Sequence, residues 1–395
     1  MPKVNPDILR WARETAGITL EEATEKLDIS EARGVSAINR LLALESGEIE
    51  PTRPMLLKMA KKYHRPLLVF YMSAPPRRGD RGQDFRTLPD EYSATSDALV
   101  DALIRNVKAR QSIVRAALED EEEIEPLHFV GSMEVDDGVI SLVESIHATI
   151  NFDLTEFHRQ SSPGDAFKYL RSKVEDIGVF VLLIGDLGSY HTAFDVNLYR
   201  GFSLSDNVAP FIIINDRDAK SAWSFTLIHE LTHIWLGQTG ISNRGSENNI
   251  EQFCNKVASE FLLPESELDS LDLTSVHEFE IIRTKISAFA SSRNLSSSIV
   301  AYNLYLRGEI SKDSWVQLDL VYQKFWADAR DERRRRAREN DGGPNYYIVR
   351  KHRVGENLIS LVQRMIIGGT LTTSKAGKVL GVKPKNVQKL LEAIR

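Results

Sequence analysis

Residues 223–237 read Trp223-Ser-Phe-Thr-Leu-Ile-His229-Glu230-Leu-Thr-His233-Ile-Trp-Leu-Gly237 and contain the motif His-Glu-x-x-His. Their apolar residues recur at helical spacing, so the stretch predicts one helix. Positions four apart lie on one face of a helix, which lets His229 and His233 direct both imidazoles at one ion. Glu230 lies one position round, where it reaches a water on that ion without ligating it. The pattern is typical of zinc hydrolases, but a five-residue motif also arises by chance.

A zinc ion held by two histidines needs a third protein ligand and leaves a fourth position for water. Residues 250–264 predict a second helix with one apolar stripe. Glu251 falls on the edge of that stripe, and an inward-facing carboxylate needs a partner. Glu247 also projects inward if the helix begins early, so both glutamates are candidate ligands. His277 lies beyond Pro264 in a separate segment.

The segments before the motif predict β-strands. Val179–Ile184 is fully apolar, and Tyr199–Leu204 and Ala209–Asn215 follow at turn-bounded spacing. Two or three strands leading into the motif helix make a small sheet packed on that helix. The edge strand of such a sheet can pair with an extended peptide and present its scissile bond to the metal. The fold class predicted for the whole chain is α+β and mostly α-helical.

A resemblance to a known family rests on motifs in a fixed order. His229-Glu-Leu-Thr-His233 is followed by Glu251-x-x-x-Asn255-x-x-Ala258 and then by Leu262-Leu-Pro264. Together they resemble the ImmA/IrrE family of metallopeptidases. Further stretches that fit the family are Arg200-Gly-Phe-Ser-Leu204, Ala209-Pro210, Asn215 and Asp84-Phe85-Arg86.

The resemblance implies a zincin-like minimal metallopeptidase core in which Glu230 is the general base. The zinc ligands that it implies are His229, His233 and Glu251. The family's ligand glutamate falls on Glu251, which decides between this residue and Glu247. Candidates for the donor that stabilises the oxyanion are Tyr190, His191 and Tyr199.

Residues 1–73 predict a bundle of short helices, one of them opened by a capping box from Thr19 to Glu22. The stretch resembles the XRE (Cro/repressor-like) helix-turn-helix family through Gly17–Ala23 and Leu44–Glu48, but Ser30–Gly34 is inserted in the expected turn. In a helix-turn-helix the second helix lies in the DNA major groove. The residues that we expect to touch bases are Ser36, Asn39 and Arg40. The same small fold also serves as a protein-docking module.

The remaining organisation follows from composition. We expect a linker over 74–95, a metallopeptidase domain over 96–330, a charged linker over 331–345 and a basic helical module over 346–395. Residues 1–78 hold 13 Lys/Arg against 10 Asp/Glu, and residues 330–395 hold 16 against 6, within a chain of net charge −6. Nucleic acid, if bound, is therefore expected at the ends. The last module has a helix-turn-helix rhythm, for which DNA contact, partner docking and core packing are equally good interpretations.

The chain of 395 residues is long enough for two or three domains. Cys254 is its single cysteine, which excludes disulfides and a thiolate-rich zinc site. No apolar run is long enough to span a bilayer, and the N-terminus lacks the apolar core of a signal peptide. These features predict a cytoplasmic protein without a membrane partner.

The family resemblance implies a zinc-dependent endopeptidase and transcriptional regulator. It is expected to bind operator DNA, as a dimer if a symmetric site is read. Its expected substrate is a repressor-like protein that controls phage, mobile-element or stress genes, or the chain's own linker near Arg77–Arg81. The alternative is an antitoxin and autorepressor of a toxin–antitoxin pair, in which the peptidase-like domain mainly binds the toxin.

Overall fold

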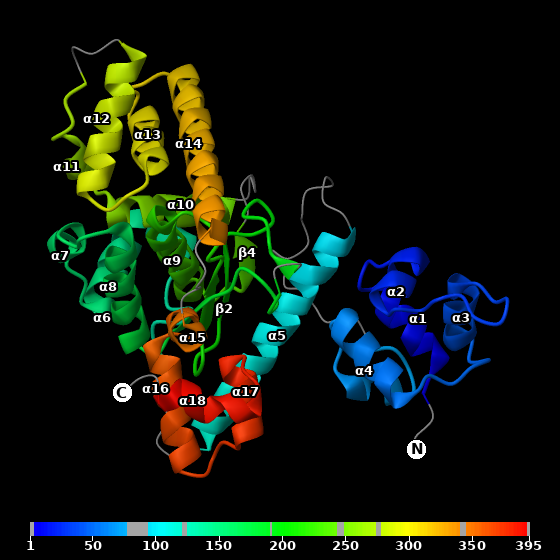
Figure 1. The fold of residues 1–395 in the computed structure, drawn as a ribbon. Coiled ribbons are helices and arrows are strands. Elements are labelled where there is room, and N and C mark those ends of the chain that lie inside the picture. Colours follow the sequence, from blue (N-terminus) through cyan, green and yellow to red (C-terminus); the bar gives the residue numbers. More distant parts are fainter. Residues whose placement is uncertain are drawn as a thin grey trace. The chain divides into compact units, whose positions relative to one another are not determined.

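The computed structural model describes residues 4–76, 94–120, 125–189, 192–242, 249–273, 278–339 and 345–392. The chain divides into two compact units, Met1–Ala109 and Arg110–Arg395. Figure 1 shows helices predominating in both units, with one small sheet in the second. The predicted fold class, mostly α-helical α+β with a small sheet beside the motif helix, is confirmed.

The first unit is built from short helices around an apolar core. Their bounds are α1 Pro6–Glu14, α2 Leu20–Lys26, α3 Ala37–Glu45, α4 Arg53–Lys62 and the 3-10 helix η1 Leu67–Tyr71, followed by α5, Ala94–Glu119, which continues into the second unit. The predicted capping box is present, because Thr19 accepts from the Glu22 backbone N–H and Glu22 accepts from that of Thr19. Buried core residues include Leu9, Leu41 and Phe70.

The connection from α2 to α3 is longer than a helix-turn-helix turn, which typically has three or four residues. Residues 27–36 make this connection, and within it Ala32 and Val35 form a short antiparallel bridge. Arg33 and Gly34 close the bridge with positive φ angles of 54° and 75°. The insertion predicted at Ser30–Gly34 is therefore a small hairpin-like turn before α3.

The second unit holds a four-stranded sheet in the order β1-β3-β2-β4. The strands are β1 Phe180–Leu183, β2 Gly201–Leu204, β3 Phe211–Ile214 and β4 Gly240–Ser242. β1 pairs parallel to β3, whereas β2 is antiparallel to both β3 and β4. The first three strands match the predicted segments. The sequence predicts no strand at β4, because the residues after Gly237 read as a polar loop.

The motif helix α9, Lys220–Trp235, lies at the centre of this unit. It packs against α8, Pro163–Asp176, and α10, Asn249–Leu262, and it lies along β2 and β3. Nearly all of its side chains from Trp223 onward are buried. Two further helices, α6 Val139–Ile150 and α7 Leu154–His158, pack around α8 and α10. Surrounding packing thus fixes α9 on every side, which holds its polar residues in place.

The helices after α10 continue the same unit. They are α11 Glu265–Leu268, α12 Phe279–Ser292, α13 Ser297–Leu306 and α14 Lys312–Glu339. The charged run expected as part of a linker over 331–345 is helical as far as Glu339. Glu332 forms ion pairs with Arg335 and Arg336, three and four positions on, and such pairs support a helix. None of the described helices is both long and apolar enough to cross a membrane.

The last segment adds α15 Tyr346–Val354, α16 Glu356–Ile367, α17 Thr373–Leu380, the 3-10 helix η5 Pro384–Asn386 and α18 Val387–Glu392. α15 contacts β1, and Arg353 forms ion pairs with Asp216 at 2.6 Å and Asp186 at 3.2 Å. Arg171 on α8 donates to the His352 carbonyl at 2.6 Å. Part of the basic charge predicted for residues 346–395 is thus used to attach α15 to the core.

Candidate metal centre

The two motif histidines and one glutamate converge inside the second unit. His229 and His233 lie one turn apart on α9, and Glu251 lies in the first turn of α10. The two Nε2 atoms are 3.3 Å apart, and Glu251 oxygens lie 3.2 Å from that of His229 and 3.3 Å from that of His233. All three residues are buried, with 5% exposure or less. Helical spacing therefore brings the two histidines together, and the packing of α10 against α9 brings Glu251 to them.

The spacing of these donors fits a tetrahedral metal ion. Zinc ligands lie about 2.0–2.2 Å from the ion, and two such ligands at a tetrahedral angle are separated by about 3.4 Å. The three donor separations are all within about 0.2 Å of that value. Two imidazoles and a carboxylate are also a donor set that zinc accepts. The residues present therefore fit a bound metal ion.

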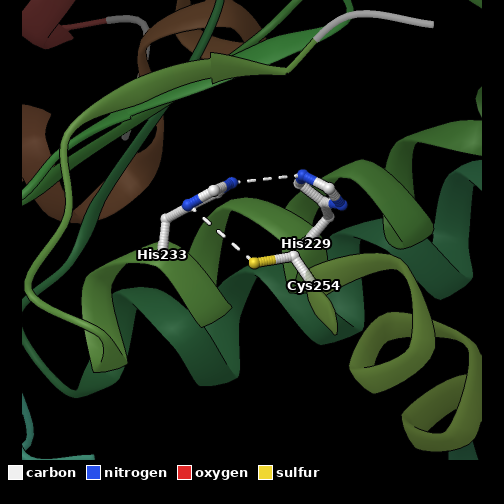
Figure 2. A group of neighbouring side chains, drawn as sticks. All are labelled: His229, His233 and Cys254. Carbon is white, nitrogen blue, oxygen red and sulfur yellow. Dashed lines mark hydrogen bonds between the residues drawn. The ribbon is translucent and has the colours of Figure 1, made fainter. Parts of the chain in front are cut away.

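The other ring nitrogens of the histidines have their own partners on α10. His229 Nδ1 lies 3.0 Å from Asn255 Oδ1, which fits a ring that donates through Nδ1 and keeps the Nε2 lone pair free. His233 Nδ1 lies 3.9 Å from the Cys254 sulfur. Figure 2 shows Cys254 on the Nδ1 side of His233, while Nε2 of that ring points to His229.

Cys254 is a second potential metal ligand. Ligand atoms of His229, His233 and Cys254 lie within 4.8 Å of one another, so this group can bind a metal. The two Nε2 atoms, however, point to Glu251, whereas Cys254 approaches the opposite nitrogen of His233. One imidazole cannot direct both nitrogens at the same ion. The geometry favours Glu251 as the third donor and Cys254 as a support for His233.

Glu230 is fully buried and lies against the backbone of β2. A Cβ built at Gly201 would come 2.9 Å from Glu230 Oε1 and 2.6 Å from Thr226 Cγ2. Only glycine therefore lets β2 approach α9 this closely. Glu230 also follows His229 directly on α9, one position round the helix from it.

The electrostatics of the cluster favour an ionised Glu251 and a protonated His233. Burial alone would raise the pKa of Glu251, but hydrogen bonds with His229 and His233 lower it to about 2. Burial likewise disfavours the charged form of His233, yet its contacts with Cys254 and Glu251 raise its pKa well above the ordinary value. An anionic Glu251 carboxylate thus faces the His233 imidazole, which accepts a positive charge, and a metal cation satisfies the same demand.

Residues 178–305 match the family model of the IrrE N-terminal-like domain, Peptidase M78. The matched region runs from two residues before β1 to the last turn of α13 and contains all the residues of the candidate metal centre. Comparison with curated proteins and with solved structures gave no match. The metallopeptidase resemblance predicted from the sequence is supported over the IrrE-like region. The XRE-like resemblance of the N-terminal helices stays a prediction.

Other predicted residues of the IrrE-like region have structural roles or lie outside the described residues. The Tyr199 hydroxyl donates to the Ile184 carbonyl, so its proton is used in a bond between strand segments. The residues outside the described ranges are Tyr190, His191, Glu247 and His277, together with Asp84–Arg86 and the Arg77–Arg81 linker.

Of the three residues predicted to contact DNA, Ser36 and Arg40 form hydrogen bonds with the backbone, whereas the Asn39 side chain lies in solvent. Ser36 is the N-cap of α3 and accepts from the Asn39 backbone N–H, and Arg40 donates to the Ser30 carbonyl. The Asn39 side chain is exposed. Beside it, the outer surface of α3 and its flanks carries the exposed apolar residues Val35, Leu42 and Ile49.

Three residues contribute to the centre although the sequence predicted no role for them: Gly201, Cys254 and Asn255. For two of them the signal was present, since Cys254 and Asn255 follow Glu251 at positions i+3 and i+4 and so share its helix face. Gly201 gave no such signal, because its importance depends on how closely β2 approaches α9.

A cavity of about 680 Å³ lies beside the centre. Its lining includes Arg200, which precedes Gly201, together with Ala222 on α9 and Phe325 on α14. The three converging donors do not line it. It is therefore a neighbouring space and not the site of the ion.

Proposed function

We propose that this protein is a zinc-dependent endopeptidase in which His229, His233 and Glu251 bind the metal. The observation that carries this proposal is that the two Nε2 atoms lie 3.3 Å apart and each lies 3.2–3.3 Å from one oxygen of Glu251, on two packed helices. The match of residues 178–305 to a peptidase family supports it.

The chain's own residues divide the chemical work. Bound zinc supplies a Lewis acid that lowers the pKa of a water molecule and polarises the peptide carbonyl. Glu230 accepts a proton from the attacking water as its oxygen bonds to the carbonyl carbon. Glu230 then transfers that proton to the amine nitrogen as the C–N bond breaks. Asn255 orients the His229 ring throughout, because it accepts from Nδ1.

The substrate is proposed to bind as an extended strand along β4. Within the described sheet β4 is an outer strand, paired on one side with β2. Its register places Ser242 opposite Gly201, whose backbone lies against Glu230. A peptide added to β4 would lie next but one to β2, about 10 Å from it, and is proposed to reach the metal centre from that edge of the sheet. A repressor-like regulator with an accessible extended segment is the proposed substrate class, and the N-terminal helices are proposed to bring the enzyme to operator DNA.

The test compares wild type with Glu230→Gln, both loaded with zinc, on a proteome-derived peptide library. We expect wild type to cleave peptides and the variant to lose at least 100-fold in rate, the usual contribution of general base catalysis. Both proteins should bind one zinc, since Glu230 is not a ligand. A variant that cleaves as fast as wild type contradicts the mechanism. Repression or toxin neutralisation that survives in the variant assigns the IrrE-like region a binding role instead, as expected for an antitoxin.

A further inference from the structure

Helices α16, α17 and α18 form a small module at the end of the second unit opposite α12 and α13 (Figure 1). Apolar side chains hold the three helices together. Those that are buried include Val362 and Met365 on α16, Val379 and Leu380 on α17, and Val387 and Leu390 on α18. This packing leaves one side of α17 and α18 in solvent.

The link between α17 and the η5–α18 segment has the length and the glycine of a helix-turn-helix turn. α17 ends at Leu380 and the next helical segment begins at Pro384, so the turn is Gly381–Lys383. Gly381 caps α17 with a φ of 65°, and the Val382 N–H donates to the Gly377 carbonyl at 2.8 Å. A Cβ added at Gly377 would lie 2.9 Å from the Val382 carbonyl oxygen. This motif has a short turn that often contains glycine. Here the turn packs closely against α17 because Gly377 has no side chain.

The solvent side of this motif is strongly basic. Residues 368–392 contain five lysines and a single acid, Glu392. The lysines are all exposed: Lys375, Lys378, Lys383, Lys385 and Lys389. Within the described part of the chain, no carboxylate forms a salt bridge with any of the five. Gln388, also exposed, donates to Glu392 at 3.1 Å and adds an amide oxygen that can accept on the same helix.

This charge is not needed for packing. On α15, by contrast, Arg353 is held by Asp186 and Asp216 and therefore has a structural role. The lysines of α17, η5 and α18 face water, where unpaired positive charge favours a polyanion. Their position on and before the second helix of the motif is where such proteins contact the major groove and its phosphates.

We propose that the surface of α17, η5 and α18 binds double-stranded DNA, with η5–α18, Pro384–Glu392, as the helix that enters the major groove. Lys383, Lys385 and Lys389 contact phosphates there. This site is separate from α3 of the first unit, whose outer surface is partly apolar. There the side chains of Ser36 and Arg40 form hydrogen bonds with the Asn39 N–H and the Ser30 carbonyl.

The experiment measures fluorescence anisotropy of a labelled mixed-sequence 30-base-pair duplex with the full chain, at about 50 to 200 mM salt. The test variant is K383Q/K385Q/K389Q, and the matched control is R53Q/K61Q/K62Q, which removes three exposed cations from α4. We expect wild type and control to bind alike, because the operator contacts proposed for the first unit lie on α3 and a mixed-sequence duplex holds no operator. The test variant should lose at least 10-fold in affinity at low salt, and its slope of log K against log salt should fall by about 2 to 3.

Each other outcome overturns the proposal. It fails if wild type does not bind the duplex, or if the test variant binds as wild type does. Loss of binding in the control alone assigns DNA recognition to the first unit. Equal competition by single-stranded RNA assigns the basic surface to another class of ligand. An unchanged melting temperature of the test variant shows that it is folded, as expected for exposed lysines.

Discussion

The two units each bury a carboxylate against basic side chains. In the first unit the carboxylate is neutralised by a permanent cation, whereas in the second unit it faces two imidazoles. In the first unit Glu45 is 1% exposed and accepts two parallel hydrogen bonds of 2.7 and 2.9 Å from the Arg13 guanidinium. Arg13 also donates to the Ile18 carbonyl. In the second unit Glu251 faces His229 and His233, whose Nε2 atoms point at each other as well as at the carboxylate.

The difference lies in the donors. A guanidinium is a permanent cation whose fork matches a carboxylate, so the Arg13–Glu45 pair is complete by itself. An imidazole offers a lone pair when neutral, so two of them and a carboxylate form a set of acceptors around one point. Burial of a carboxylate therefore identifies no function. What distinguishes a structural pair from a candidate metal centre is whether the neighbouring groups bring their own charge or need one.

The largest effect should come from breaking the complete pair. Glu45→Ala leaves the Arg13 cation buried without its partner and should destabilise the first unit by about 3–5 kcal/mol. Hydrogen exchange of the full chain measures this as lost protection in residues 4–76. Glu48→Ala, at an exposed position of the same segment, should change stability by less than about 0.5 kcal/mol. Equal effects of the two changes would mean that the pair is not structural.

Zinc binding should stabilise only the second unit, and by less than the loss of Glu45 destabilises the first. At a free concentration 100 times its Kd, zinc should stabilise the second unit by about 2.7 kcal/mol and leave residues 4–76 unchanged. Hydrogen exchange with zinc against EDTA measures both units in one experiment. Glu251→Gln should lose this protection, whereas Glu260→Gln on the same helix should keep it. Zinc protection that persists in Glu251→Gln argues for Cys254 as the third ligand.

The smallest effect is the pH dependence of the metal-free centre. The pKa of Glu251 is lowered from 4.5 to about 2, so its contribution to stability is present above pH 4.5 and is lost as the pH falls toward 2. At pH 4 the loss relative to pH 7 should be about 0.8 kcal/mol. Urea unfolding in EDTA should show it as a difference between wild type and Glu251→Gln that narrows on acidification. A constant difference would show that the imidazoles do not stabilise the ionised form.

Sequence periodicity predicted much of the core. The apolar spacing around His229 and His233 defined α9, the stripe from Ile250 defined α10, and three apolar runs marked β1, β2 and β3. Strand β4 was missed, because it pairs through its backbone with β2 and has no apolar run of its own. The charged run after Arg330 reads like a linker by composition but is helical, since its opposite charges recur at i+3 and i+4.

The sequence by itself determined which residues could form a metal centre, because helical spacing puts His229 with His233 and leaves Glu251 and Glu247 as inward-facing carboxylates, between which the family resemblance decided. It also determined that Cys254 and Asn255 share the helix face of Glu251. Only the tertiary structure decided how these side chains meet, through the packing of α9 against α10. It also decided the role of Gly201, whose missing side chain lets β2 lie on Glu230. The physical reason is that periodicity is local, whereas distances between donors on separate elements are set by how those elements pack.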